Sequence, residues 1–443
     1  MVVDYIRKKE NILPIVLGIV FSWAYYKLPL DRFGILLLGF MALIPIFHDI
    51  RVGVIIAIIV LPFVDFVIGL IYIAFIIGVY LYNVFFKGVN PLKKEAIDFP
   101  IILFAILILI SAITSVDFQG SLRDLIFHFI ALGFVFVLVN TIDTKRDFNI
   151  FITFLVIAAT LVAILGLFQY TDAIRIEGSW TDFINNPSTN IRIYSVLDNP
   201  NILAEYLVMT IPISIALFWY SKRIHKKLLF FITTSILLLS LVLTLSRGGW
   251  LGLSFGMIVF ALLVEKKLLF IIPIFAIMVY SLPERILNRL MSIGNYLEDS
   301  SSSYRIKIWK IALEVIKDNW LVGVGLGYIP FKMVYESYAS NMPTYHIHNT
   351  FLQIVGEMGV MGLMVFTFFM FILFKYSIKR LIKGEDRYIQ VMAGGLLSGL
   401  AALLVHGIVE SILFMPKIII TFWTLVGLIL ALMRISKEEE QVG

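Results

Sequence analysis

The sequence contains no cysteine among its 443 residues, and only 15% of its residues are charged. The absence of cysteine excludes disulfide bonds, thiol nucleophiles and thiolate metal sites. The net charge of +6 is not the signature of a nucleic-acid-binding protein, because the basic residues fall in short loops between apolar runs. Hydrophobic residues make up 60% of the chain, so the composition is typical of a membrane protein.

Apolar runs of about 20 residues recur along the whole chain, and each is long enough to cross a hydrocarbon core of ~30 Å. They predict an all-α polytopic membrane protein of about 12–14 transmembrane helices, forming a single transmembrane domain over residues 1–443. The first run begins at Asn11 and continues into further apolar segments without a small-residue cleavage site, so we interpret it as a span rather than a signal peptide. We place the spans at roughly 11–29, 33–48, 52–66, 67–86, 98–115, 123–140, 150–170, 200–220, 228–246, 248–264, 268–283, 350–374, 390–411 and 416–434.

Residues 52–86 are compatible with two arrangements, because Pro62 and Asp65 interrupt one long apolar run. The run forms either two short spans or one kinked, tilted helix. With two spans, the basic residues of every short loop fall on one side, as the positive-inside rule requires. The sequence then predicts that both termini are cytoplasmic, in the inner (plasma) membrane.

This topology leaves two sizeable extracytoplasmic segments, residues 171–199 and 284–348. The second contains YRIKIWKIALEVIKDNW (304–320), whose apolar residues repeat at helical spacing. We expect an amphipathic helix lying along the outer membrane surface. The following GVGLG (323–327) predicts a flexible turn. A dinucleotide-binding loop is the alternative, but it lacks the strand–helix–strand context.

Three arginines lie near the predicted outer ends of the helices. Arg247 lies in TLSRGGWLGL between two spans, Arg192 precedes SVLDNPN, and Arg305 begins the amphipathic segment. Charged residues near a bilayer are costly and tend to face a polar cavity or a partner. Several cations with few carboxylates nearby suggest an anionic ligand, and the planar guanidinium holds phosphate oxygens with paired hydrogen bonds. The simpler alternatives are lipid headgroup contacts for Arg247 and Arg305, and an ion pair with Asp198 for Arg192.

Two carboxylates also lie within predicted spans. Glu357 follows the HIHN stretch at 346–349, and a structural role as acceptor for a facing helix is one interpretation. His406 and Glu410 are four residues apart on the penultimate predicted span and would share one helix face. That pair is either internal packing of polar groups or a proton relay.

His346 and His348 stand immediately before the apolar run that starts near residue 350. A His-x-His pair chelates a metal only with a third or fourth ligand, which Glu298 or Asp299 would have to supply by folding back. The other interpretation is an imidazole at an aqueous edge that accepts a proton near neutral pH. Neighbouring arginines disfavour the imidazolium and keep the base in its neutral form. We favour a base and expect no metal and no cofactor.

TLSRGGWLGL, YRIKIWKIAL, NWLVGVGLG and HNTFLQIVGEMGVMGL occur in this order around a large predicted outer loop. In this the chain resembles the O-antigen ligase family of bacterial membrane glycosyltransferases, over roughly residues 100–435. The family also includes O-antigen polymerases and oligosaccharyltransferases that glycosylate protein hydroxyls. The resemblance implies a GT-C-like helical fold with a cavity facing the extracytoplasmic side.

The resemblance further implies a donor glycan on undecaprenyl diphosphate and transfer to a lipid, polysaccharide or protein hydroxyl without metal or nucleotide. It implies catalytic roles for His348 of the HN motif and for the diphosphate-binding Arg247 and Arg305. On the substrate side it points to these residues: Arg192, Asn199, Asn201, Asn349 and Glu357. We expect direct attack by the acceptor, and hence inversion at the anomeric carbon.

Two other classes of function compete with this interpretation. A small-anion transporter, for bicarbonate or organic acids, would show internal repeats and broken helices at the midplane. The halves of this chain show no convincing repeat, and the polar residues collect on one side. A flippase for lipid-linked glycans would need polar groups through the full depth of the membrane. Within the family, ligase, polymerase and protein O-oligosaccharyltransferase remain alternatives that differ in the acceptor.

Overall fold

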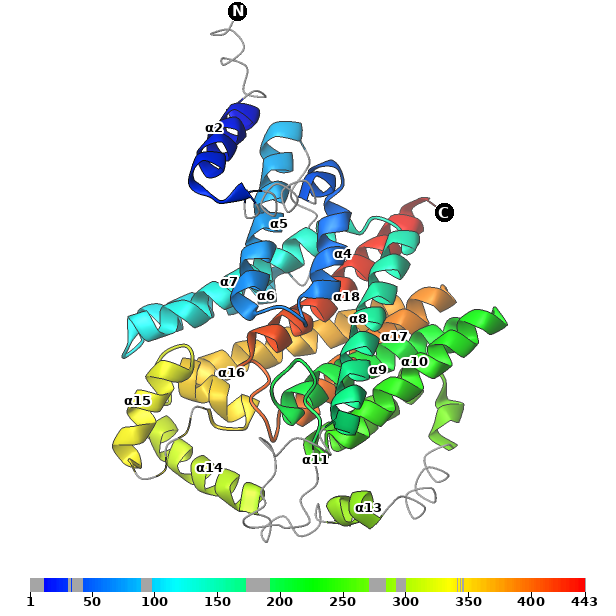
Figure 1. The fold of residues 1–443 in the computed structure, drawn as a ribbon. Coiled ribbons are helices and arrows are strands. Elements are labelled where there is room, and N and C mark those ends of the chain that lie inside the picture. The colour runs from blue at the N-terminus through cyan, green and yellow to red at the C-terminus, as the bar shows by residue number, and fades with distance from the viewer. Residues whose placement is uncertain are drawn as a thin grey trace, which may run out of the picture. The chain divides into compact units, whose positions relative to one another are not determined.

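The computed structural model describes residues 12–30, 33, 43–88, 98–172, 192–270, 284–291, 300–340, 342, 344 and 346–442. Every regular element in this part of the chain is a helix (Figure 1). The chain divides within α4 (Ile50–Val60) into two units, residues 1–53 and 54–443. The first unit contains α2 (Ile12–Lys27), in which Tyr25 packs edge to face with Phe33, with ring centroids 5.2 Å apart.

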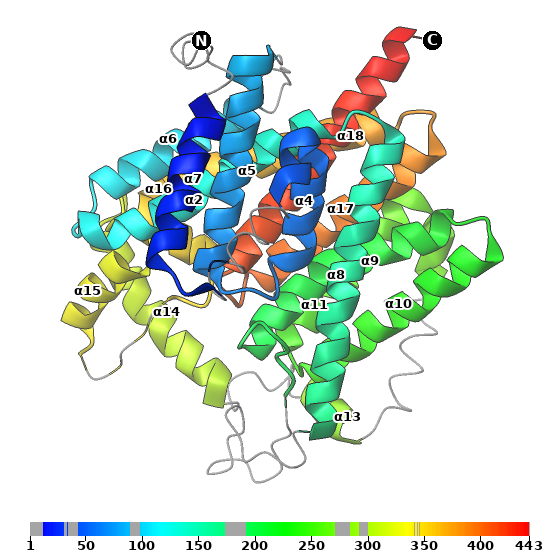
Figure 2. The same ribbon diagram turned by 45° about the horizontal axis from the view of Figure 1, so that its top comes forward.

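The second unit contains the remaining helices, which Figures 1 and 2 show from two sides. After α4 they are α5 (Phe66–Lys87), α6 (Asp98–Ile113), α7 (Phe118–Thr141), α8 (Lys145–Asp172), α9 (Pro200–Tyr220), α10 (Ile224–Leu243), α11 (Arg247–Val264), η2 (Lys266–Phe270), α13 (Glu284–Met291), α14 (Ser300–Asp318), α15 (Tyr328–Tyr338), α16 (Thr350–Ser377), η3 (Ile378–Ile382), α17 (Arg387–His406) and α18 (Pro416–Val442).

Nine of the described helices are long and apolar enough to cross a membrane, and two shorter apolar helices, Ile50–Val60 and Phe99–Ile113, accompany them. The prediction of an all-α polytopic membrane protein is therefore confirmed. The predicted span 268–283 lies outside the described residues except for 268–270, and most of 33–48 lies outside them too. Residues 61–65 separate α4 from α5, so the interrupted run forms two helices rather than one kinked helix.

Side-chain caps fix where several helices begin. Asn199 accepts a hydrogen bond from the Asn201 N–H before α9, and Pro200 occupies the first helical position, where no N–H is needed. Ser246 caps α11 and Asn349 caps α16 in the same way. These polar residues satisfy backbone donors that lack partners at a helix start, so they place the ends of three helices.

Small residues bring α9, α11 and α17 close together in the centre of the unit (Figure 2). A Cβ atom on Gly252 or Gly256 of α11 would come within 2.5–2.7 Å of backbone oxygens of α17, and one on Gly399 of α17 would come within 2.4 Å of the Met209 oxygen. Such glycine-lined contacts are typical of helix packing in membranes. These contacts fix the position of α17 relative to α9 and α11.

The apolar face of α14 is buried inside the protein, which corrects the expectation that this helix lies along the membrane surface. Ile308, Ala312 and Val315 have no exposed surface and pack with Phe331 and Tyr335 of α15. The amphipathic pattern was read correctly as a helix, but its apolar stripe covers α15 and the start of α16. Periodicity shows that a face is buried and does not show what covers it.

The predicted flexible turn at 323–327 is closely packed backbone. Gly323 and Gly325 have φ of 76° and 114°, and a Cβ on Gly325 would lie 2.0 Å from the Ser115 hydroxyl. The N–H groups of Val324 and Gly325 donate to carbonyls of α16, which itself breaks at Gly359 (φ 67°). Glycine is needed where φ is positive and neighbours approach this closely. The segment therefore anchors α14 and α15 to the break in α16.

Candidate active site

The ends of five helices meet around one polar cluster in the second unit. α9, α11, α16 and α18 begin there, and α17 ends there at His406. The start of a helix presents unsatisfied N–H groups and a partial positive charge. The capped starts of α9, α11 and α16 therefore add to the positive potential of the arginines in this region.

Glu410 is the centre of the cluster. Its Oε1 accepts hydrogen bonds from the Arg305 guanidinium and from Asn201 Nδ2, the latter at 2.6 Å, and its Oε2 lies 3.0 Å from His348 Nδ1. The Glu410 side chain is 7% exposed, against 14% for Arg305 and 23% for His348. One buried carboxylate thus joins residues from α9, α14 and the segment before α16.

The geometry at His348 assigns its tautomer. Because an ionised carboxylate only accepts hydrogen bonds, Nδ1 carries the proton that it donates to Glu410. The other ring nitrogen, Nε2, then presents a lone pair and can take a proton from a substrate. His348 has φ of 55°, in the left-handed region, immediately before the Asn349 cap, which turns the chain sharply into α16.

Arg247 and Arg192 lie near the Glu410 cluster, and each is held there by its own hydrogen bonds. Arg247 Nη2 donates to Ser302 Oγ at 2.9 Å, and Ser302 stands three residues before Arg305, on the same face of α14. Arg192 donates to the Thr244 carbonyl and to Asn201 Oδ1, both at 2.8 Å. The cations predicted from sequence therefore connect to the Glu410 cluster through Ser302 and Asn201.

The electrostatics of the cluster favour an ionised Glu410. Burial alone would raise the pKa of Glu410, but the Arg305 charge and the hydrogen bond from His348 hold it below its usual range. Burial, followed by the proximity of His348 and Arg305, lowers the pKa of His346 to about 3. His346 is therefore neutral at physiological pH, and its ring packs 4.1 Å from that of His348.

The asparagines divide into two groups. Asn201 contacts both Arg192 and Glu410, whereas Asn199 acts through its cap on α9. Asn349 caps α16 and donates to the Ile408 carbonyl at 2.8 Å, so it holds the loop after α17 against the start of α16. Those contacts position His348 on one side and Glu410 on the other.

Glu357 lies away from the Glu410 cluster, on α16 beside its break at Gly359. Its side chain accepts a hydrogen bond from Gln353 at 2.6 Å, and its carbonyl accepts bonds from Ser111 and Gly325. The structure thus brings together Arg247, Arg305, Arg192, Asn199, Asn201, His348 and Asn349 but not Glu357. The contacts of Glu357 match its simpler interpretation as a structural acceptor.

Glu410 is the residue of the cluster whose position differs from the one expected from the sequence. The sequence suggested that it shares a helix face with His406, but α17 ends at His406 and Glu410 lies in the following turn. Its partners are 62, 105 and 209 residues away in sequence. His406 instead packs against α11, where a Cβ on Gly248 would lie 2.7 Å from its ring.

His346, His348 and Glu410 also satisfy the geometry of a metal site, since their ligand atoms lie within 4.8 Å of one another. Glu410 supplies the third ligand that a His-x-His pair needs to bind a metal. The sequence offered Glu298 and Asp299 for this role, and both lie outside the described residues. Both Glu410 oxygens already accept hydrogen bonds, one of them from a guanidinium. A divalent cation would have to displace these bonds and approach Arg305, so the surroundings fit a hydrogen-bonded carboxylate better than a metal ligand.

Comparison with known proteins supports the resemblance noted in the sequence. Residues 232–367 match the family described as O-Antigen ligase. Over 132 residues the chain is 33% identical to the exopolysaccharide production protein ExoQ of Rhizobium meliloti (strain 1021), a match that covers 28% of this chain and 29% of that protein. The aligned part thus spans under a third of that relative's length. The matched residues 232–367 include Arg247 and Arg305, and they lie in a chain whose described helices include nine long and apolar enough to cross a membrane.

Proposed function

We propose that this chain is a metal-independent glycosyltransferase of polysaccharide production. It moves a glycan from undecaprenyl diphosphate to an acceptor hydroxyl at the extracytoplasmic face of the plasma membrane. The observation that carries the proposal is the Glu410 carboxylate, which bonds Arg305 and His348 at the same time. In this proposal the guanidinium is the group that binds phosphate and the neighbouring imidazole is the base.

The arginines would act on the leaving group. When the glycosidic bond to the diphosphate breaks, negative charge grows on the departing oxygen, and fixed cations stabilise it in the transition state. Arg305 has five N–H donors and uses one nitrogen on Glu410, which leaves a fork of donors for phosphate oxygens. Arg247 of α11 donates to Ser302, which lies on α14 with Arg305, and Arg247 would bind the second phosphate.

His348 would act on the acceptor. Its Nε2 takes the hydroxyl proton as the acceptor oxygen attacks the anomeric carbon, and the resulting imidazolium is stabilised by Glu410. A positioned general base contributes about 10²–10⁴-fold to a rate. Glu410 itself keeps its negative charge and serves to orient the ring, the role that a carboxylate has in a catalytic triad. Direct attack opposite the diphosphate gives inversion of configuration.

The membrane setting is consistent with this reaction. The polyprenyl tail would lie between apolar helices, while the diphosphate and the sugars stay at the polar helix ends where the cluster is built. The family match and the name of the exopolysaccharide production relative support a polysaccharide product. Both termini would then be cytoplasmic, as the distribution of basic loop residues predicts.

The test is an assay of purified protein with undecaprenyl-diphosphate-linked glycan and candidate acceptors. A single transfer to each acceptor would identify a ligase, and a ladder of lengths would identify a polymerase. An inverted anomeric centre in the product is expected, and retention would exclude direct attack. Uptake of small anions into liposomes without any glycosyl transfer would overturn the proposal in favour of transport.

A further inference from the structure

A cavity of about 340 Å³ is lined in part by residues that lie next in sequence to the Glu410 cluster, and it is used by none of the steps above. It lies between the turn joining α4 to α5, the segment before α9 and the start of α18. Its lining combines charged groups with apolar ones: Asp65, Asp198, Lys417, Phe63, Phe66 and Met415. Small-molecule sites have volumes of roughly 300–1,000 Å³, so the cavity is large enough for a ligand.

The cavity and the candidate base share neighbouring residues. Asp198 directly precedes Asn199, and Met415 directly follows Phe414. The Phe414 ring lies 4.5 Å from that of His346, which in turn lies 4.1 Å from that of His348. These links connect the cavity wall to the Asn199 cap on one side and to the histidine pair on the other.

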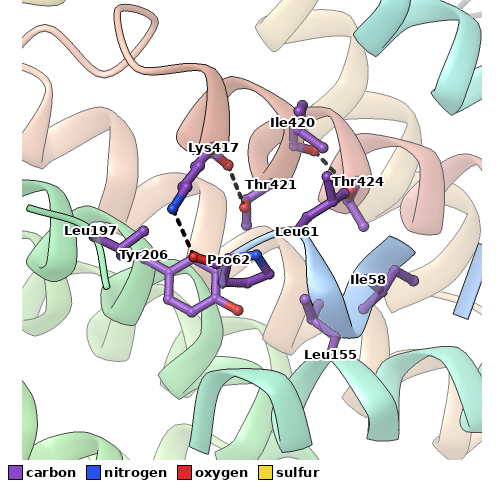
Figure 3. A pocket seen from close by; sticks show the side chains of 10 residues that line it. All are labelled: Ile58, Leu61, Pro62, Leu155, Leu197, Tyr206, Lys417, Ile420, Thr421 and Thr424. Carbon is purple, nitrogen blue, oxygen red and sulfur yellow. Dashed lines mark hydrogen bonds between the residues drawn. The ribbon is translucent and has the colours of Figure 1, made fainter. Parts of the chain in front are cut away.

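The walls of the cavity are held in place by hydrogen bonds. Lys417 Nζ donates to the Pro62 carbonyl at 2.8 Å, a bond drawn in Figure 3, which shows a separate pocket that also borders Lys417. Lys417 Nζ donates to the Val196 carbonyl at 3.1 Å as well, so it ties the α4–α5 turn to the segment before α9. Asp65 caps α5 by accepting a bond from the Val67 N–H at 2.8 Å. Hydrogen bonds of the folded protein therefore define the shape of the cavity.

The chemistry of the lining selects the class of ligand. The lining carries two exposed carboxylates, Asp65 and Asp198, against one ammonium group, Lys417, so its net negative charge disfavours an anion. The carboxylates accept hydrogen bonds well from hydroxyl groups. The Phe63, Phe66 and Met415 side chains offer apolar surface. A ligand with many hydroxyls and apolar C–H faces matches both features, and this describes a saccharide.

We propose that this cavity binds a saccharide adjacent to the reacting centre, which names a substrate subsite for the glycosyl transfer and rests on that proposed function. The saccharide is either the sugar that bears the attacked hydroxyl or the first sugars of the donor glycan. The two sources present the same hydroxyl chemistry to Asp65 and Asp198. Replacing these carboxylates distinguishes the two sources, because it weakens binding of the acceptor in one case and of the donor in the other.

The test uses Asp65→Asn and Asp198→Asn in the full-length protein. Asparagine still caps a helix and tolerates the φ of 59° at position 198, so both variants should fold. We expect the KM for one substrate to rise about tenfold in each variant, the effect of one weakened charged hydrogen bond, with kcat within about twofold of wild type. A rise for the acceptor assigns the cavity to the acceptor, and a rise for the donor assigns it to the donor glycan.

Asp117→Asn is the matched control, because Asp117 also caps a helix, accepting from the Gly120 N–H at 3.1 Å, but does not line the cavity. It should leave both KM values unchanged. A third cavity variant, Met415→Trp, fills the cavity without altering a charge and should weaken binding of the same substrate. Wild-type KM values for both substrates in all three cavity variants would overturn the saccharide site while leaving glycosyl transfer intact.

If the wild-type protein shows no glycosyl transfer, the proposed function fails. A binding measurement then tests separately whether the cavity binds a saccharide. Equilibrium titration of the protein with oligosaccharides from the host's own polysaccharide is then compared for wild type and Asp198→Asn. Binding that weakens about tenfold in the variant supports the site. Binding that is absent, or equal in the two proteins, overturns it.

Discussion

Replacing Glu410 by glutamine tests the coupling between the cation and the base. The substitution keeps the size of the side chain but removes its charge, and it places an NH₂ group where an oxygen accepts hydrogen bonds. If that NH₂ group donates to His348 Nδ1, the ring proton moves to Nε2, the atom that has to accept the proton of the substrate. The base is then held in the wrong tautomer.

The expected size of the effect follows from these contacts. Exchanging the orienting carboxylate of a serine protease for an amide lowers kcat by about 10⁴, and a general base contributes about 10²–10⁴. We expect kcat to fall by about 10²–10⁴ in Glu410→Gln. The variant also leaves the Arg305 guanidinium, 14% exposed, without its counter-charge. Breaking such a buried pair from one side costs about 3–5 kcal/mol of stability at most.

The assay is transfer from the lipid-linked donor by folded, purified variant, with Tm measured in parallel. Asp386→Asn is the control, because Asp386 pairs with Lys145 at 2.6 Å and caps the opposite end of α17. It should retain wild-type kcat. A folded Glu410→Gln protein with kcat within threefold of wild type would refute the assignment of His348 as a base oriented by Glu410.

The acid stability of the fold should also change in Glu410→Gln. Because the pKa of Glu410 lies below its usual range in the folded protein, its ion pair stabilises the fold above the unfolded pKa of about 4.3. That stabilisation is lost as the pH falls through the lower folded pKa. The Tm of the variant should therefore fall less than that of wild type below about pH 4, and an equal fall would contradict the ion pair.

Four further predictions follow from particular contacts. Gly359→Ala should lower Tm by several degrees, because φ is 67° and a Cβ would lie 2.1 Å from the Leu321 oxygen, whereas Gly78→Ala, with open space around it, should leave Tm unchanged or raise it. His346 has a pKa of about 3, so folding loses stability as the pH drops below about 6.5, and His346→Phe should show a smaller fall in Tm between pH 7 and 5 than wild type. Arg247→Lys should raise the KM for the donor about tenfold or more, because an ammonium lacks the fork that holds phosphate; an unchanged KM would remove Arg247 from the diphosphate site. EDTA should leave transfer unchanged, and activity lost in EDTA and restored by a divalent cation would assign His346 and its neighbours to a metal.

The membrane-spanning helices were predictable because their signal is local. Runs of about 20 apolar residues and the residues that cap them, such as Asn199 and Asn349, mark helices and their starts without knowledge of neighbours. The interruption at Pro62 and Asp65 was also visible, and the chain forms two helices on either side of it. The destination of the α14 apolar face was not predictable, because periodicity is the same for a face covered by lipid and for one covered by α15.

The candidate site was predictable in its cations and its base but not in the residue that connects them. Arg247, Arg305 and His348 stand out because charge and imidazole are rare beside apolar runs. Glu410 looks like a residue of the last turn of a helix, and only the end of α17 at His406 turns it toward Arg305. Contacts over a hundred residues or more leave no trace in local spacing, which is also why the cavity beside Asp198 was invisible in the sequence.

Chemical rescue at position 348 tests the central claim most directly. His348 has a positive φ, which glycine adopts without strain, so His348→Gly should fold and leave space for a small base. We predict that this variant loses at least about 100-fold in the rate of glycosyl transfer from the lipid diphosphate and regains part of it when imidazole is added. Transfer by His348→Gly at the wild-type rate without imidazole would contradict the account.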